Sequence, residues 1–286
     1  MAIAIVAIQY RWPETVAFLC PISCYFAIAC GVISHNHNHQ PTFSIKRLNR
    51  GFGHILTIFY GYPTMMWIPT HNLNHHLFTN RPGDATITWR HTNLHNLFVV
   101  LTYPFVSAYS QSDAVKTYIR RAKQKNPKLY YRILFQYAFW VGVNLGMLWM
   151  AWYLHHHRQN WTGLYVWFFA LMLPAISSAT VIMMFNYVQH VHADAWSDHD
   201  HSRNFTSRSF NFLFFNNGYH TAHHLRPGLH WSELKAAHEK IAQEIDPTLN
   251  ERSLCWFVFR QYFLAPFFPR LGTTQIGGPP HQQPAQ

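Results

Sequence analysis

Three long apolar runs constrain the fold of this 286-residue chain more than any other feature. They cover residues 15–33, 133–154 and 161–185, and each is close to the roughly 20 residues that a helix needs to cross the bilayer core. A single segment that crosses lipid must be helical, because only then are its backbone polar groups satisfied internally. The sequence therefore predicts an all-α integral membrane protein with about three to four membrane-spanning helices.

The composition agrees with a membrane location. Hydrophobic residues make up 49% of the chain and charged residues 12%, which is about half the usual charged share of a soluble domain. The mean hydropathy of -0.11 is low because 22 histidines and many asparagines lie outside the apolar runs. Aromatic residues make up 17%, as expected for a protein with two membrane–water interfaces.

Shorter segments predict further membrane-associated elements. Residues 55–70 and 97–108 are apolar but interrupted by proline, and each predicts a segment that dips into the membrane or a partly immersed helix. Residues 113–132 are basic and aromatic, which predicts an interfacial amphipathic helix. We expect one membrane-embedded domain over residues 1–270 with a His-rich cytoplasmic cap, and a disordered tail over 271–286.

Nine histidines fall into four clusters that suit a pair of bound metal ions. Neutral imidazole is the commonest protein ligand for transition metals, and residues three or four apart share one face of a helix. Such neighbours are close enough to grip one ion together, and His35/His39, His71/His75 and His220/His223/His224 all meet this condition. The nine candidate ligands are His35, His39, His71, His75, His76, His190, His220, His223 and His224. Because the clusters adjoin apolar segments, they predict metal chemistry on a lipid-soluble substrate.

Neighbouring polar residues have two interpretations each. His37, two residues from His35 and His39, faces away from them on a helix but could replace one of them as a ligand. Asp84 could orient a ligand imidazole or lie in solvent. The carboxylates of 194–200 could orient ligand imidazoles, which we favour, or could equally belong to a solvated loop.

Charge distribution predicts the orientation in the membrane. Of 22 Lys and Arg, all but Arg11 and Arg158 lie in segments that also carry the His clusters. By the positive-inside rule this places the clusters in the cytoplasm and the N-terminus outside. The basic surface suits anionic lipid headgroups, an acidic electron-donor protein or an acyl carrier. No basic-aromatic module is recognisable, so nucleic acid is not an expected partner despite the net charge of +11.

With these motifs in place, the chain resembles the integral-membrane fatty acid desaturase and hydroxylase superfamily. That superfamily carries three histidine boxes of the forms HX3–4H, HX2–3HH and HX2–3HH, which match residues 35–39, 71–76 and 220–224 here. Residues 186–190, which end at His190, resemble an additional ligand element of alkane-hydroxylase-like members. Residues 79–84 and 228–231 also look family-like, and the resemblance covers roughly residues 35–240.

The resemblance implies a non-haem centre of two Fe ions, held by the nine histidines, with O2 as co-substrate. Attack on an unactivated methylene needs an oxidant that side chains cannot supply, which agrees with a metal cofactor. The implied substrate is a fatty acyl chain, carried as a lipid, acyl-CoA or acyl-carrier protein. Electrons would come from a separate donor such as ferredoxin, rubredoxin or cytochrome b5, because no haem- or flavin-binding segment is recognisable.

Three functions follow from these features. The expected one is O2-dependent desaturation of a fatty acyl chain. The alternative within enzymes is a fatty acid or alkane hydroxylase (monooxygenase) with the same centre. A membrane metal-binding or transport protein is disfavoured, because transporters place their ligands near the bilayer midplane, whereas these clusters flank the spans.

Overall fold

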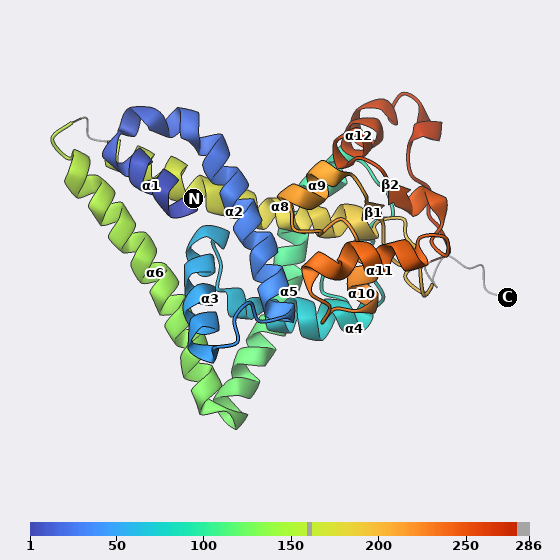
Figure 1. Cartoon of the computed structure of the whole chain (residues 1–286), viewed down its shortest axis with the longest axis horizontal. Coiled ribbons are helices and arrows are strands. Elements are labelled where there is room, and N and C mark those ends of the chain that lie inside the picture. Colours follow the sequence, from blue (N-terminus) through green and yellow to red (C-terminus); the bar gives the residue numbers. More distant parts are fainter. Residues whose placement is uncertain (159–161, 279–286) are drawn as a thin grey trace. The chain divides into compact units, whose positions relative to one another are not determined.

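The computed structural model describes residues 1–158 and 162–278 and is built almost entirely of helices (Figure 1). Three of its helical segments are long and apolar enough to cross a membrane: Pro13–His39, Pro127–His155 and Thr162–His190. They confirm the all-α membrane fold and the three expected spans, although Trp161, the expected start of the third, lies outside the described residues. The chain divides into two compact units.

The first unit comprises Met1–Ile68 and Val115–Ile182. Its elements are α1 (Ala2–Arg11), η1 (Pro13–Thr15), α2 (Val16–His39), α3 (Lys46–Tyr60), η2 (Thr64–Met66), the end of α5 (Leu97–Lys125), α6 (Pro127–His155), α7 (Thr162–Trp167), η4 (Phe168–Met172) and the start of α8 (Leu173–His190).

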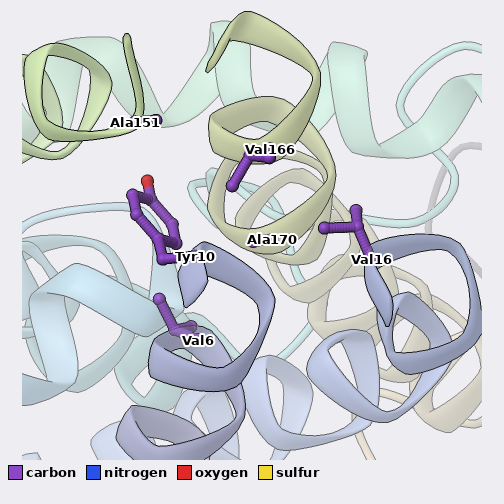
Figure 2. Close-up of a cluster of buried hydrophobic side chains, with 6 residues drawn as sticks. All are labelled: Val6, Tyr10, Val16, Ala151, Val166 and Ala170. Atoms are coloured by element: carbon purple, nitrogen blue, oxygen red, sulfur yellow. The ribbon is translucent and has the colours of Figure 1, made fainter. Parts of the chain in front are cut away.

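One core of this unit joins α1 to the second and third spans. Val6 and Tyr10 of α1 pack with Val16, Ala151, Val166 and Ala170, as Figure 2 shows. The hydroxyl of Tyr10 donates to the carbonyl of Met147 at 3.3 Å, and Nε2 of His155 donates to the carbonyl of Tyr10 at 2.8 Å. The short first helix is therefore attached to α6 by both apolar and polar contacts.

Small residues allow α2 and α8 to approach closely. A Cβ on Gly31 would lie 2.9 Å from Oγ of Ser178, and that hydroxyl donates to the carbonyl of Ala27 at 2.8 Å. Such contacts are typical of membrane helices, where small side chains bring the backbones together. The end of α2, which carries the first histidine box, is thereby supported by the third span.

The segment between the second histidine box and the second span differs from the expectation. The apolar stretch 97–108 and the basic stretch 113–132 are not two separate elements, because α5 runs unbroken from Leu97 to Lys125 and contains Pro104. The break falls at Asn126, whose side chain accepts a hydrogen bond from the backbone N–H of Leu129 and begins α6. Ala122 and Ile133 are buried together on either side of it.

The second unit comprises Pro69–Ala114 and the described part of Met183–Gln286. Its elements are the π-helix η3 (Ile68–His75), α4 (His76–Phe78), the start of α5, the end of α8, β1 (Asn204–Phe205), α9 (Arg208–Leu213), α10 (His220–Leu225), η5 (Trp231–Glu233), α11 (Leu234–Ile241), η6 (Pro247–Leu249), β2 (Asn250–Glu251), α12 (Leu254–Phe259), the π-helix η7 (Arg260–Leu264) and η8 (Pro269–Leu271).

Two short strands and the C-terminal segment hold this unit together. β1 and β2 pair in parallel with Asn204 opposite Asn250. Within the expected tail, the backbone N–H of Ile276 donates to the carbonyl of His192, and the side chain of Gln275 donates to the carbonyl of Ala193. Residues 272–278 thus lie against the loop that follows α8, while 279–286 lie outside the described residues.

Candidate metal centre

Seven of the nine candidate histidines lie in the second unit, where they form two groups of imidazoles. The first group holds His75, His190, His220 and His224, and the second holds His71, His76 and His223. Within each group the candidate nitrogen atoms all lie within 4.8 Å of one another. The second and third boxes each contribute to both groups.

This distribution corrects the expectation that neighbours within a box would grip one ion together. His71 and His75 fall in different groups, and their segment is the π-helix η3 rather than an α-helix. A π-helix is hydrogen-bonded i→i+5 and is therefore wider than an α-helix. Nε2 of His71 lies 3.1 Å from Nε2 of His76, the residue that directly follows η3. The α-helical rule holds in α10, where Nε2 of His220 lies 3.1 Å from Nε2 of His224, but His223 joins the other group.

The four-histidine group has spacings that suit one metal ion. Nε2 of His190 lies 3.1 Å from Nε2 of His75 and 3.0 Å from Nε2 of His220. With metal–nitrogen bonds of about 2.0–2.1 Å, neighbouring ligand nitrogens in octahedral or tetrahedral sites lie ~2.9–3.4 Å apart. The side chains of His75, His190 and His220 are all buried, so the group faces little water.

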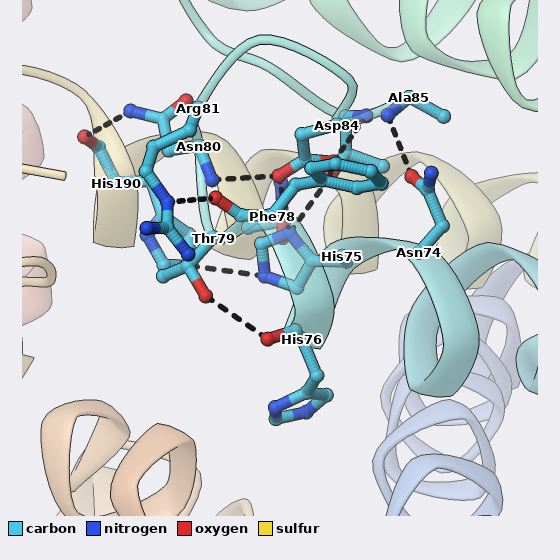
Figure 3. A network of polar contacts seen from close by, with 12 residues as sticks. Asn74, His75, His76, Phe78, Thr79, Asn80, Arg81, Asp84, Ala85 and His190 are labelled. Atoms are coloured by element: carbon cyan, nitrogen blue, oxygen red, sulfur yellow. Dashed lines mark hydrogen bonds and ion pairs between the residues drawn. The ribbon is translucent and has the colours of Figure 1, made fainter. Parts of the chain in front are cut away.

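Asp84 fixes the proton on His75 (Figure 3). Its carboxylate is 2% exposed and lies 2.8 Å from Nδ1 of His75. Burial raises the pKa of this carboxyl, but the His75 imidazole and hydrogen bonds from His75 and Thr86 outweigh that effect and lower it to about 2. An ionised carboxylate only accepts hydrogen bonds, so Nδ1 of His75 carries the proton and Nε2 carries the lone pair.

A backbone carbonyl fixes His190 in the same way. Nδ1 of His190 lies 3.0 Å from the carbonyl oxygen of His201, which can only accept, so the lone pair of His190 is also on Nε2. Asn80 connects this histidine to Asp84: its side chain donates to the carbonyl of His190 at 3.1 Å, and its backbone N–H donates to the Asp84 carboxylate at 2.7 Å (Figure 3). Asn80 has a φ of 61°, a left-handed conformation that asparagine adopts more readily than most residues.

The positions of these protons show whether the four-histidine group suits a metal ion. Nε2 of His75 and Nε2 of His190 each present a lone pair at a separation of 3.1 Å, and two acceptors repel unless a cation lies between them. Burial lowers the pKa of His224 well below its usual value, and the neighbouring imidazoles lower it further. Neutral imidazole is the form that binds metal, so the donor set fits a transition-metal ion.

The second group repeats this spacing around one residue. Nε2 of His76 lies 3.1 Å from Nε2 of His71 and 3.1 Å from Nε2 of His223. The rings of His71 and His223 are nearly parallel, with centroids 6.1 Å apart. Three imidazoles therefore converge on a second position that fits a metal ion.

The remaining two candidates, His35 and His39, lie in the last turns of α2 in the first unit. Their ring centroids are 4.8 Å apart, as expected for an i, i+4 pair. Nδ1 of His35 donates to the side-chain oxygen of Asn36 at 3.0 Å, which leaves the lone pair on Nε2. His35 therefore presents the lone pair of Nε2, as His75 and His190 do.

The structure gives His37 a different role. Its Nδ1 accepts from the backbone N–H of Thr42 at 3.3 Å, and its Nε2 lies 3.2 Å from the carbonyl of Asn49, to which it donates. Both ring nitrogens therefore contact the α2–α3 connection. His37 holds that connection and is not placed as a ligand.

Asp84 orients a candidate ligand, as one of its two interpretations predicted, but the carboxylates of the loop after α8 do not. Asp194 and Asp200 do not have the favoured role: Asp194 accepts from the backbone of Trp196, and Asp200 accepts from Ser197 and from the backbone of Asp246. These bonds shape the loop after α8.

Sequence reasoning missed three kinds of supporting residue: Asn80, the backbone of His201, and the buried Arg203 beside it. Arg203 is 1% exposed and donates to carbonyls at the end of α8. A fully buried arginine leaves no pattern in the sequence. Only the motif 79–84 pointed toward Asn80.

Comparison with known proteins agrees with this geometry. The family model described as fatty acid desaturase matches residues 12–256. The chain belongs to the fatty acid desaturase family. The matched range contains all nine candidate histidines and the three candidate spans of this desaturase-family chain. Neither the curated proteins nor the solved structures gave a match.

Proposed function

We propose that this protein catalyses O2-dependent desaturation of a fatty acyl chain at a histidine-ligated pair of iron ions. Family membership and histidine groups that can hold metal support desaturase- or hydroxylase-type oxidoreductase activity. The observation that carries the proposal is the four-histidine group, because the hydrogen bonds of His75 and His190 direct two lone pairs toward each other. That arrangement is repulsive without a cation.

The proposed ligands are the nine histidines of the three boxes and of the end of α8. Those of the second unit would hold the metal in their two groups, and His35 and His39 join the proposal on their sequence spacing and tautomer. Bound iron would supply the O2-dependent redox chemistry that removes two hydrogens from adjacent methylenes. Imidazole ligands are compatible with iron, although geometry rather than affinity selects it over zinc.

Residues around the proposed ligands keep the imidazoles neutral, fix their orientation and shield them from water. Asp84 and the carbonyl of His201 hold protons on the Nδ1 atoms of His75 and His190, and hydrogen-bonded carboxylates or carbonyls of this kind raise ligand basicity. Burial of His75, His190 and His220 limits the access of water to these ligands. A separate donor such as ferredoxin, rubredoxin or cytochrome b5 would deliver the electrons.

We further propose that the histidine boxes face the cytoplasm. At the start of the second span, the exposed cations Lys123, Lys125 and Lys128 surround the α5–α6 junction. At its other end lies Arg158, 3.9 Å from Glu14 in an exposed pair. The excess of cations at the start of α6 supports a cytoplasmic location for that end.

The test is product analysis with two histidine variants. Cells that express the wild type, His220→Ala or His230→Asn receive a range of fatty acids, and their lipid extracts are analysed by gas chromatography–mass spectrometry. His230 is a matched control, since it is exposed and caps η5 near the third box. A product lighter by two hydrogens with the wild type and His230→Asn, but not with His220→Ala, supports desaturation.

Other outcomes have defined meanings. A product heavier by one oxygen would replace desaturation with hydroxylation by the same centre. A product that persists in His220→Ala would contradict the ligand assignment. Metal flux across vesicles without any O2-dependent product, with reduced donor supplied, would overturn the enzyme proposal.

A further inference from the structure

Four consecutive buried residues connect the two ligand-bearing helices of the four-histidine group. We infer that the segment His201–Asn204 sets the separation between His190 and His220, with Arg203 and Asn204 as its positioning residues. This inference rests on the proposed metal site and assigns the residues that hold its geometry. The side chains of Ser202, Arg203 and Asn204 are at most 1% exposed.

On one side the segment is bonded to the end of α8. The backbone N–H of Arg203 donates to the carbonyl of Gln189 at 2.6 Å. Its Nη1 donates to the carbonyls of Val188 and Val191 at 2.8 and 3.0 Å. Helix ends leave carbonyls without intrahelical partners, and a cation there also interacts favourably with the helix dipole. These bonds surround His190, whose own Nδ1 donates to the carbonyl of His201.

On the other side the segment is bonded to the start of α10. Oδ1 of Asn204 accepts from the backbone N–H of Thr221 at 3.0 Å, and Nδ2 of Asn204 donates to Oγ1 of Thr221 at 3.0 Å. Oγ1 of Thr221 in turn donates to the carbonyl of Ser202 at 3.1 Å. Thr221 directly follows His220, and Tyr219, at the N-cap position of α10, makes no side-chain cap. Asn204 therefore takes over the capping of this six-residue helix.

The segment contacts the two helix ends with alternate side chains. Arg203 contacts the end of α8, whereas Ser202 and Asn204 contact Thr221 of α10. A displacement of this segment would shift the end of α8 relative to the start of α10. It would therefore change the distance between Nε2 of His190 and Nε2 of His220, which is 3.0 Å.

The free-energy cost of burying the charged Arg203 side chain supports a role for it in positioning the end of α8. Burial lowers the pKa of its guanidinium to about 10, so it remains charged at neutral pH, and a buried charge is expensive unless it is well compensated. Compensation comes from the carbonyls of Val188 and Val191, at and just after the end of α8. The charge of Glu251 and the ring of Phe257, 5.0 Å from Cζ, add to it. Lysine lacks the planar group that makes these contacts together, so it is not an equivalent residue here.

The experiment compares Arg203→Lys and Asn204→Ala with the control Arg260→Lys in the full-length protein. Arg260 lies over the same Phe257 ring, 5.7 Å from it, but pairs with Glu251 and with the carbonyl of Leu271 instead of α8. Each protein is titrated with Fe(II) under anaerobic conditions, the visible spectrum of its Co(II) form is recorded, and thermal unfolding is measured without metal. The Co(II) spectrum reports ligand geometry, which a purely structural loss does not alter in the folded fraction.

We expect Arg203→Lys and Asn204→Ala to bind Fe(II) tenfold to a hundredfold more weakly and to have altered Co(II) spectra, while Arg260→Lys binds as the wild type does. Wild-type affinity and spectrum in both variants would overturn the inference, as would a fall in metal-free stability with unchanged binding. If His220→Ala loses metal but these variants do not, only the inference fails. If the wild type binds no metal, both the inference and the proposed function fail.

Discussion

Replacement of Asp84 by asparagine tests the orientation of His75 with almost no change in shape. In the wild type, Oδ2 of Asp84 accepts from Nδ1 of His75 at 2.8 Å and from the backbone of Asn80 at 2.7 Å. Oδ1 accepts from the backbone N–H and the hydroxyl of Thr86, both at 2.7 Å. All four partners are donors, so an amide nitrogen at either position faces two of them.

The magnitude follows from that count. If the amide nitrogen faces Thr86, the hydroxyl can rotate away and one backbone N–H is left without an acceptor. An unsatisfied buried donor costs about 1–3 kcal/mol, so we expect Asp84→Asn to lose about that much stability. If the amide faces His75 instead, the proton of that imidazole moves to Nε2 and its lone pair no longer faces His190. Metal binding should then weaken by about tenfold to a hundredfold.

The assay combines two measurements on purified protein. Thermal unfolding of the metal-free protein should show a fall of about 5–10 °C in the midpoint, and anaerobic Fe(II) titration should show the weaker binding. Asp198→Asn is the control, because the Asp198 side chain is exposed and only its carbonyl is used, by His201. Wild-type stability and affinity in Asp84→Asn would refute the tautomer argument.

Three further predictions follow from the same structure. His37→Gln should keep its metal content, measured by mass spectrometry, but unfold about 1 kcal/mol more easily, because its bonds to the α2–α3 connection are lost. Gly218→Ala should lower the free energy of unfolding by about 3 kcal/mol or more, or prevent expression of folded protein, because a Cβ there would lie 2.1 Å from the carbonyl oxygen of Phe205. Gly228→Ala is the control and should leave stability unchanged, because a Cβ there meets no atom within 4 Å. A fluorescent protein fused to the C-terminus should fluoresce in the cytoplasm and an alkaline phosphatase fusion should be inactive, and the reverse pattern would contradict the proposed orientation.

The three spans could be predicted from the sequence because each is recognised from the hydrophobicity of one continuous run of residues. An apolar run of about 20 residues has few stable alternatives to a helix across the bilayer, and the candidate spans contain the expected runs apart from the undescribed Trp161. The same reasoning failed for 97–132, where a proline and a change from apolar to basic residues indicated a break. The helix α5 continues through both features and ends at Lys125, just before Asn126, which caps α6.

The candidate histidines were also visible in the sequence, but their grouping was not. Residue spacing predicts which side chains share a helix face only when the helix type is known. Here the π-helix η3 ends at His75, and His71 lies against His76, the next residue, while His75 joins the other group. The residues that fix protons and helix ends are a carboxylate, a backbone carbonyl and a buried arginine. Long-range pairing decides these contacts, which single-sequence patterns do not encode.

Because the second and third boxes each contribute ligands to both groups, the two metal positions are coupled through the backbone. His75 and His76 are adjacent in the chain yet belong to different groups, and so are His223 and His224. Because neighbouring residues cannot move independently, a displacement at one metal position is transmitted through these two pairs to the other. Loss of one ligand, for example in His76→Ala, should therefore weaken binding at both positions, and Fe(II) titration should show more than one equivalent affected. Loss of a single equivalent, with the other bound as in the wild type, would show that the two positions are independent.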